Sequence, residues 1–231
     1  MSDMSFTAAV ILAAGSSTRM GGGRHKLLLP LDGKPVLAHV IEAALASQAR
    51  PVVVVLGHQA MHVRDQIAAY LERPGIIVVE NRDYMQGMST SMRAGLGVLL
   101  ERTYKEEGQG GGAQINVDSA LIMLGDQPLI TAKVIDTLID TWKVTGKRIV
   151  APMYGGKRGG PTLFAASLFS ELMEVSGDEG GRRVLEKHRE EVEMVEFGDV
   201  ADVGTSYDVD TWEAYQEVVE AWQKKRDNRG E

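Results

Sequence analysis

The segment from Leu12 to Lys26 has the composition of a phosphate-binding loop, because it is rich in glycine and serine and contains Arg19 and Lys26. Small side chains let backbone N–H groups approach a ligand, and successive amides form a concave site for an anion. Arginine forms paired hydrogen bonds with phosphate oxygens, and lysine adds a positive charge. The segment has neither the G-K-S/T ending of a P-loop nor the G-x-G-x-x-G of a dinucleotide site. It is therefore either a phosphate-binding loop or a glycine-rich turn with exposed basic residues.

Two aspartates are candidates for holding a divalent ion. Asp126 follows an apolar segment that predicts a strand, and Asp208 lies shortly before the last predicted helix. Mg²⁺ takes few protein ligands and keeps substrate phosphates among the others, so carboxylates beside a phosphate-binding loop suit it. The alternatives are that Asp126 closes a turn and that Asp208 is a solvated loop residue. Asp210, with Glu213 three residues later, is predicted to cap the last helix.

A second segment of glycine and hydroxyl residues, from Gly87 to Ser91, opens a predicted helix. Its amides and hydroxyls could border a nucleobase, or Ser89 could cap the helix, and both can hold at once. The five histidines are scattered along the chain and predict no metal site.

Apolar runs alternate with helical periodicity, which predicts the elements that position these residues. The predicted strands are 8–13, 51–56, 76–79, 120–124 and 149–152, and the predicted helices are 35–47, 59–72, 89–101, 133–145 and 211–225. Segment 105–114 has nothing apolar to bury and is predicted to be a surface loop. Alternating strands and helices predict an α/β fold with a mostly parallel sheet between two layers of helices. Ligands bind beyond the carboxyl ends of such strands, where the candidate residues lie.

Length and composition limit the classes of protein to consider. The 231 residues, 44% of them hydrophobic, suit a single domain spanning 1–231. The net charge of −7 disfavours nucleic acid as a partner, and the lack of cysteine excludes disulfides and thiolate chemistry. The start lacks the pattern of a signal peptide, and no apolar run approaches the roughly 20 residues that span a bilayer. We therefore expect a cytoplasmic protein without a membrane partner.

These motifs, in this order, resemble the nucleotidyltransferases related to molybdenum cofactor cytidylyltransferase. The family pattern L-A-A-G-x-S-x-R-M-G, followed by a lysine, is similar to residues 12–21 and Lys26. Further family motifs are similar to residues 33–36, 87–96, 125–128, 158–164, 177–182 and 208–211. The resemblance extends over residues 8–216 and implies a Rossmann-like, three-layer α/β/α fold of the nucleotide-diphospho-sugar transferase type. It implies a nucleotide-binding part over residues 6–150, an acceptor-facing part over 151–205 and a C-terminal helix over 211–226.

The resemblance also implies roles for residues at matching positions. Arg19 and Lys26 would act on the phosphates, and Asp126 and Asp208 would hold Mg²⁺. The implied nucleotide-binding residues are Leu12, Ala13, Ala14, Gly15, Ser16, Gly87, Met88, Ser89, Ser91 and Gly125. The implied acceptor-binding residues are Gly159, Pro161, Gly177, Asp178, Gly180 and Arg182.

The implied reaction is transfer of CMP from CTP, or of another nucleotide from its triphosphate, to a phosphorylated small molecule such as molybdopterin, with release of pyrophosphate. A molybdoenzyme that receives the product is an implied partner. CTP is favoured at Ala14, because relatives that use CTP tend to have L-A-A-G where those that use GTP have L-A-G-G. The chain departs from the family at residues 21–26, a slightly longer stretch, and at Gly160, where many relatives have His or Asn. The alternatives are a sugar-phosphate or isoprenoid-precursor nucleotidyltransferase, a non-catalytic chaperone for a molybdoenzyme, and a structural α/β domain.

Overall fold

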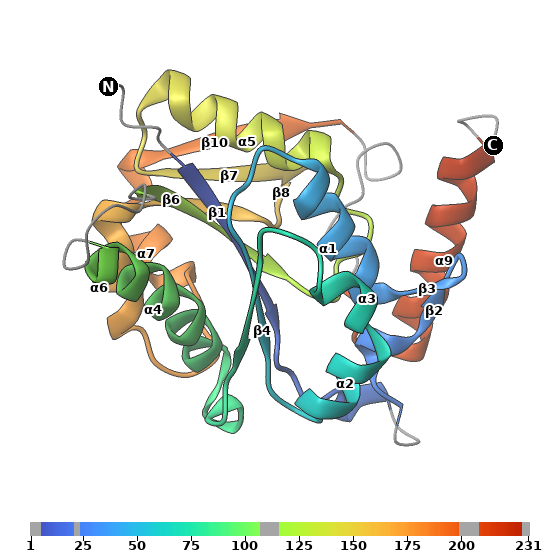
Figure 1. The fold of residues 1–231 in the computed structure, drawn as a ribbon. Helices are drawn as coiled ribbons and strands as arrows, with labels where there is room; N and C mark the ends of the chain where they lie inside the picture. The colour runs from blue at the N-terminus through green and yellow to red at the C-terminus, as the bar shows by residue number, and fades with distance from the viewer. Residues whose placement is uncertain (1–5, 21–23, 107–115, 199–207, 228–231) are drawn as a thin grey trace.

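A mixed, mostly parallel sheet lies between two layers of helices, which confirms the expected three-layer α/β/α fold (Figure 1). The computed structural model describes residues 6–20, 24–106, 116–198 and 208–227. The strand order is β10-β7-β9-β6-β1-β4-β5, with β8 paired to β7. The strands are β1 (Phe6–Ala13), β4 (Val52–Leu56), β5 (Ile76–Glu80), β6 (Val117–Leu124), β7 (Ile149–Tyr154), β8 (Lys157–Arg158), β9 (Thr162–Ala165) and β10 (Val192–Phe197).

The central strands are apolar on both faces because helices cover both faces of the sheet. In β1, the odd-numbered residues from Ala9 to Ala13 join one hydrophobic core, and the even-numbered residues from Ala8 to Leu12 join the other. β4 is fully buried and divides its valines between the two cores in the same way. The parallel pairs β1–β4, β1–β6 and β4–β5 therefore bring their carboxyl ends to one edge of the sheet.

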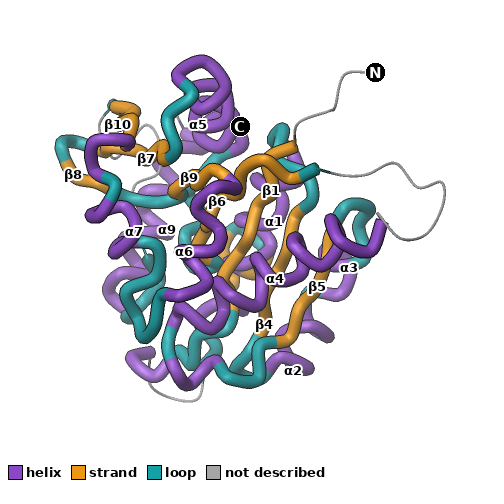
Figure 2. Tube along the Cα trace, turned by 90° about the vertical axis from the view of Figure 1, so that its left-hand side faces the viewer, coloured by secondary structure: helices purple, strands orange, loops and turns teal. Residues whose placement is uncertain are grey.

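Each face of the sheet is covered by its own group of helices (Figure 2). The first group contributes to one core and consists of α1 (Val36–Ala46), α2 (Ala60–Gln66), α3 (Ala68–Leu71) and α5 (Ala132–Thr145). The second group contributes to the other core and consists of α4 (Met88–Glu106), α6 (Phe169–Glu174) and α7 (Arg182–Lys187). Gly95 lets α4 approach β1 closely, because a Cβ atom at this position would lie 2.3 Å from Cγ1 of Val10.

A smaller apolar cluster joins the last helix to the chain near its start. The hairpin of β2 (Pro30–Leu31) and β3 (Lys34–Pro35) turns at Asp32 and Gly33, both with positive φ, as in a type I′ turn. Helix α9 (Trp212–Asp227) packs beside this hairpin (Figure 1), and the hydroxyl of Tyr215 donates a hydrogen bond to the carbonyl of Pro30. This packing places the residues just before α9 next to the carboxyl end of β6.

The structure differs from the sequence-based expectations in the strands after residue 150 and in two helices. β9 runs antiparallel to β6 and β7, and β10 pairs with β7, so the stretch after residue 150 adds strands to the same sheet. The helix expected over 59–72 is broken at Ile67 into α2 and α3. Helix α4 continues to Glu106 into the expected loop over 105–114, while residues 107–115 lie outside the described residues. None of the helices in the described ranges is long and apolar enough to cross a membrane.

Candidate functional site

A cavity of about 740 Å³ opens at the carboxyl ends of β1, β4 and β6. The loop that follows β1 forms one wall, since every residue from Leu12 to Arg19 lines the cavity. Apart from its neighbours in the chain, none of the described residues would lie within 4 Å of a Cβ atom added at Gly15, so they leave space beside this glycine. The loop is held by Ser17, which has a positive φ of 54° and whose Oγ accepts a hydrogen bond from the backbone N–H of Lys26 at 3.2 Å. Residues 21–23 of the glycine-rich segment lie outside the described residues.

Lys26 is the centre of an ionic cluster in this cavity. Its ammonium group donates to the carboxylates of Asp126 and Asp210, the latter at 2.7 Å. Arg19 pairs with the same Asp210 at 2.5 Å from the solvent side, where the Arg19 side chain is 72% exposed. The longer stretch before Lys26 therefore still brings its amine into the site.

The charges of this cluster depend on one another. Burial lowers the pKa of Lys26, but the two carboxylates outweigh burial and raise that pKa above its ordinary value. Burial raises the pKa of Asp210, and Lys26 and Arg19 more than reverse that shift. Lys26 is therefore charged at neutral pH, and it partly neutralises the acidic side of the cavity.

Asp208 is held beside Asp126 by the backbone. The N–H of Val209 donates to the carbonyl of Asp126 at 3.1 Å, and the side chain of Gln127 donates to Asp208 at 2.6 Å. Burial raises the pKa of Asp208, and the negative charges of Asp126 and Asp210 raise it further. A cation close to these carboxylates would relieve that repulsion.

The donor set of this acidic side fits a Mg²⁺ ion that is shared with a substrate. Asp126 and Asp208 both line the cavity, and carboxylate oxygens are the ligands that Mg²⁺ prefers. Among the described residues, no group of three or more His, Asp or Glu side chains could hold a metal ion by itself. An ion bound here would thus complete its shell with water and substrate phosphate oxygens, as Mg²⁺ usually does.

The start of α4 forms another wall through Gly87, Met88 and Ser91. Ser89 was one candidate to cap this helix, but its hydroxyl is buried and has no partner among the described residues. Its N–H donates to the carbonyl of Gly177 at 3.0 Å. The carboxylate of Asp178 instead accepts from the N–H of Met88 at 3.0 Å. Asp178, which is distant in sequence, therefore accepts a hydrogen bond from a backbone N–H at the start of α4. Asp178 also lines the cavity.

Two implied nucleotide-binding residues do not line the cavity. Ser89 is fully buried. Gly125 lies behind the loop, where its N–H donates to the carbonyl of Leu12 at 2.9 Å and a Cβ atom would lie 3.1 Å from that of Ala13. Both residues support the cavity walls from behind.

The implied acceptor-binding residues lie in two places. The segment with Gly159 and Pro161 adjoins Gln127, whose Oε1 would lie 3.0 Å from a Cβ atom added at Gly160, and Pro161 itself is buried. The segment from Gly177 to Arg182 packs against the start of α4, where Gly180 contacts Met88. Within this second segment only Asp178 lines the cavity. Arg182 is exposed and pairs with Glu186 at 2.8 Å.

Sequence reasoning missed some residues of the site and misassigned one. Asp210 was expected to cap α9, but Thr211 accepts the hydrogen bond from the N–H of Ala214 at 3.2 Å, and Asp210 joins Lys26 instead. His58 and Tyr84, which line the cavity, were not predicted. Each follows the carboxyl end of a parallel strand, so the rule that located Asp126 would also have located these two residues.

The chain matches a known protein family over most of its length. The model of the MobA-like NTP transferase domain matches residues 9–192. The chain is also 34% identical over 141 residues to the bifunctional protein GlmU of Leifsonia xyli subsp. xyli. That match covers 60% of this chain and 25% of GlmU, so the chain spans about a quarter of the length of this relative.

Solved structures resemble the whole fold. Rv0371c from Mycobacterium tuberculosis H37Rv superposes with a TM-score of 0.74 at 26% identity, covering 94% of this chain and 98% of that one. A second structure of Rv0371c, in complex with manganese, has a TM-score of 0.70 at 26% identity, with coverages of 93% and 98%. CMP:2-keto-3-deoxy-manno-octonic acid synthetase complexed with CTP has a TM-score of 0.66 at 17% identity, covering 95% and 99%, and shows the fold alone.

Proposed function

We propose that this chain, which belongs to the MobA-like NTP transferase domain family, transfers CMP from CTP to a phosphorylated small molecule and releases pyrophosphate. The proposal rests on the residues that line one cavity. The loop from Leu12 to Arg19, the amine of Lys26 and the carboxylates of Asp126 and Asp208 all line it. Together they offer an anion-binding loop and a cation-binding pair on two sides of the same space.

Asp126 and Asp208 would hold Mg²⁺ in this proposal. A manganese complex of Rv0371c, which is 26% identical to this chain, supports a divalent ion in proteins of this fold. When bound, the ion would supply charge neutralisation at the phosphate oxygens.

The residues of the chain would act mainly by positioning and charge. An oxygen of the acceptor phosphate attacks the α-phosphorus of CTP, the bond from that phosphorus to the bridging oxygen breaks, and pyrophosphate leaves with the electron pair. The acceptor phosphate is already anionic at neutral pH, so no strong general base is required. Lys26 would exchange its carboxylate partners for the α-phosphate, and Arg19 would steady the departing pyrophosphate.

The nucleotide and the acceptor are indicated by different segments of the chain. Ala14 favours CTP, because the segment Leu12–Gly15 has the L-A-A-G form of the CTP-using relatives. The acceptor would be molybdopterin, and the product would pass to a molybdoenzyme. The choice of acceptor rests on the family resemblance of the motifs at 158–164 and 177–182. In the first of these motifs, Gly160 adjoins Gln127, which donates to Asp208 of the acidic pair, Asp126 and Asp208.

A turnover panel tests the proposal. The protein would be incubated with Mg²⁺ and each of the four nucleoside triphosphates, with and without a molybdopterin-type acceptor, and pyrophosphate release would be measured. We expect release with CTP that depends on the acceptor, with the other triphosphates slower. Parallel reactions with a sugar phosphate and with a phosphorylated isoprenoid precursor test the two other acceptor classes.

Each result of the panel has a distinct meaning. Release that requires a sugar phosphate or an isoprenoid precursor would replace the acceptor and keep the nucleotidyltransferase. Tight CTP binding without release from any acceptor would favour a non-catalytic chaperone. Failure to bind any Mg²⁺–triphosphate would contradict the whole proposal.

A further inference from the structure

The charged residues of the site are joined by an apolar cluster that lies outside the cavity. It is the cluster that packs α9 beside the β2–β3 hairpin, and we call it the α9 cluster. Its buried members are Leu29, Leu31, Val36, Leu129, Val209, Tyr215 and Val218. None of these seven residues lines the cavity.

Two of the charged residues are connected to the α9 cluster by short segments. Lys26 lies in a helical turn (Lys26–Leu28) that is followed at once by Leu29, and Asp126 lies three residues before Leu129. The N–H of Leu29 donates to the carbonyl of Lys26 at 3.3 Å, which keeps the first connection tight. Packed interiors transmit small displacements, so the positions of both charged groups depend on how the cluster packs.

The segment with Asp208 and Asp210 is connected to the cluster directly. Val209, which lies between the two aspartates, is fully buried in the cluster. The N–H of Asp210 donates to the carbonyl of Asp208 at 2.9 Å, so the backbone turns tightly at Val209. Because packing fixes Val209, the cluster also fixes where the carboxylates on either side of it lie.

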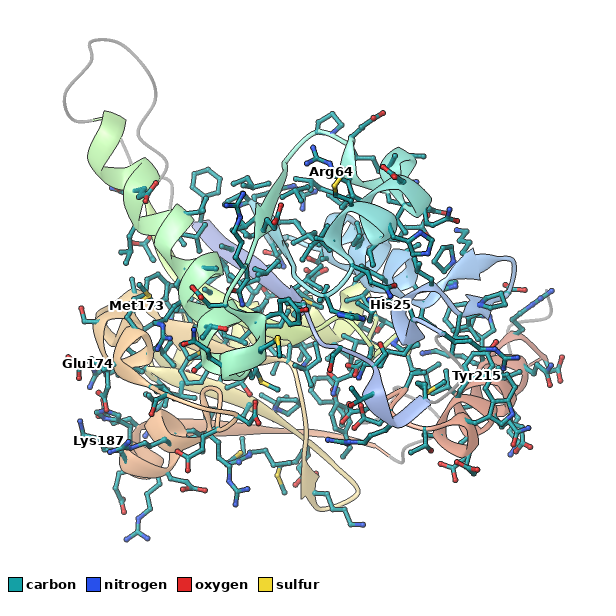
Figure 3. All side chains as sticks on the ribbon, turned by 90° about the horizontal axis from the view of Figure 1, so that it is seen from below. His25, Arg64, Met173, Glu174, Lys187 and Tyr215 are labelled. Carbon is teal, nitrogen blue, oxygen red and sulfur yellow. The ribbon has the colours of Figure 1, made fainter. Side chains whose placement is uncertain are left out.

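Tyr215 makes a polar contact within this otherwise apolar cluster. It lies in the first turn of α9, it is only 9% exposed, and its hydroxyl donates to the carbonyl of Pro30. Figure 3 labels Tyr215 on α9, toward the edge of the molecule, and His25, which precedes Lys26, nearer the middle. The hydrogen bond therefore joins the start of α9, which follows Asp210, to the hairpin that follows Lys26.

We propose that Tyr215 is a positioning residue for the divalent ion of the proposed reaction. By tying the start of α9 to the hairpin, its hydroxyl sets the carboxylates of Asp208 and Asp210 in place relative to Lys26 and Asp126. The inference rests on the proposed function and adds to it a residue that lies outside the cavity. Phenylalanine at this position keeps the aromatic packing and loses only the hydrogen bond.

Arg226 provides a matched control on the same helix. Its guanidinium pairs with Asp32, at the tip of the hairpin, at 2.5 Å, and both side chains are exposed. Arg226 therefore also joins α9 to the hairpin, but it follows Tyr215 by about three helical turns, or roughly 16 Å. An exposed ion pair contributes little to stability, and this one is far along the helix from Asp208 and Asp210.

Calorimetric titration with CTP, once in Mg²⁺ and once in EDTA, tests the positioning role. No acceptor is added, so binding is measured without turnover. The ratio of the two dissociation constants, which we call the Mg²⁺ enhancement, measures how well the carboxylates hold the ion beside the nucleotide. Loss of one hydrogen bond changes an equilibrium constant by about two- to tenfold.

We expect Tyr215→Phe to lower the Mg²⁺ enhancement by about two- to tenfold. The affinity for CTP in EDTA should stay unchanged, because the loop from Leu12 to Arg19 and the amine of Lys26 still bind the phosphates. Arg226→Gln should change neither value.

Three results would overturn the positioning role and leave the proposed function in place. They are an unchanged Mg²⁺ enhancement in Tyr215→Phe, an equal loss of CTP affinity in Mg²⁺ and in EDTA, and a loss of enhancement in Arg226→Gln as large as in Tyr215→Phe. If the unmodified protein bound CTP equally well with and without Mg²⁺, or did not bind it at all, the proposed function itself would fail, and the role of Tyr215 with it.

Discussion

At the scale of single residues, Lys26 connects the parts of the site that the chain supplies from distant positions. Its amine contacts Asp126, 100 residues away in sequence, and Asp210, 184 residues away. Without ligand, Lys26 balances two carboxylates that would otherwise repel each other. A lysine amine is a point charge with three donors, so it can exchange carboxylate oxygens for phosphate oxygens with little rearrangement.

Replacement of Lys26 by alanine should therefore slow turnover strongly. We expect Lys26→Ala to lower kcat by about a hundredfold or more, the scale of losing one electrostatic stabiliser in an active site. Steady-state kinetics would measure this effect, with Lys34→Ala as the matched control, because Lys34 pairs with Glu42 at 2.7 Å and does not line the cavity. An unchanged kcat in Lys26→Ala would remove Lys26 from the reaction.

Asp126→Asn tests the acidic pair separately from Lys26. The amide keeps the shape of the side chain and loses its charge, so we expect the fold to persist and the Mg²⁺ concentration for half-maximal activity to rise severalfold. The maximal rate should fall by about a hundredfold or more. Asp140→Asn, on the exposed face of α5, is the control. The same Mg²⁺ dependence in both variants would contradict a metal role for Asp126.

Local sequence patterns predict some residues of the site and miss others. Asp126 and Lys26 were predicted because each follows a recognisable local motif. Asp210 was misassigned because the helix-capping pattern fits two adjacent residues, and only the contact with Lys26 decides between Asp210 and Thr211. Ser89 fits the capping pattern as well, but Asp178 lies in a segment that no local rule connects to α4.

At the scale of elements, the site depends on how closely α4 packs against the sheet. Gly95→Ala would place a methyl group 2.3 Å from Cγ1 of Val10, so α4 or β1 must shift. We expect this overpacking to destabilise the protein by about 1–3 kcal/mol. Gly97→Ala on the same helix meets no atom of the described residues within 4 Å and should stabilise the protein by up to about 1 kcal/mol through helix propensity.

Urea unfolding of both variants would measure this difference. An equal change in the unfolding midpoint for Gly95→Ala and Gly97→Ala would contradict the close packing of α4 on β1.

A second element-scale prediction concerns the junction of α6, α7 and β10. His188 lies between Glu171 and Glu191, at 2.8 Å and 2.9 Å, and these hydrogen bonds raise the pKa of His188 above its ordinary value of 6.5. Hydrogen bonds from Lys187 and His188 lower the pKa of Glu171, and one from His188 lowers that of Glu191, both from 4.5. The stabilisation by His188 is complete below pH 6.5 and is lost as pH rises through its raised pKa. The stabilisation by the two glutamates is present above pH 4.5 and is lost at lower pH.

The junction should therefore stabilise the fold most between pH 4.5 and 6.5. His188→Gln should lower the urea midpoint more at pH 5.5 than at pH 8.5. Equal losses at the two pH values would show that His188 contributes by packing and not by charge.

The elements predicted best are those whose patterns come from burial. β4 and α5 lie within one or two residues of their predicted bounds, because an apolar run covered on both faces and an amphipathic helix are local signals. β9 and β10 were missed for a physical reason. β9 has four residues whose pairing is decided by β6 and β7, and β10 is a half-buried strand with Glu193 and Glu196 in its interior.

At the scale of the whole molecule, the basic and the acidic residues of the site lie at one edge of the sheet. The chain has a net charge of −7, yet Arg19 and Lys26 place positive charge at the loop where β1 ends. An anionic ligand is therefore attracted locally by a protein that repels polyanions overall. The strand order places Asp126 on the β6 side of that loop, and His58 and Tyr84 on the β4 and β5 side.

The most direct test of this account is a crystal structure of the protein with CTP and Mn²⁺, with the ion located by its anomalous scattering. We predict an anomalous peak bonded to Asp126 and Asp208, with the triphosphate against the loop from Leu12 to Arg19 and within reach of Lys26. A peak away from the two carboxylates, or a triphosphate outside that loop, would contradict the central claim that one cavity grips the phosphates from both sides.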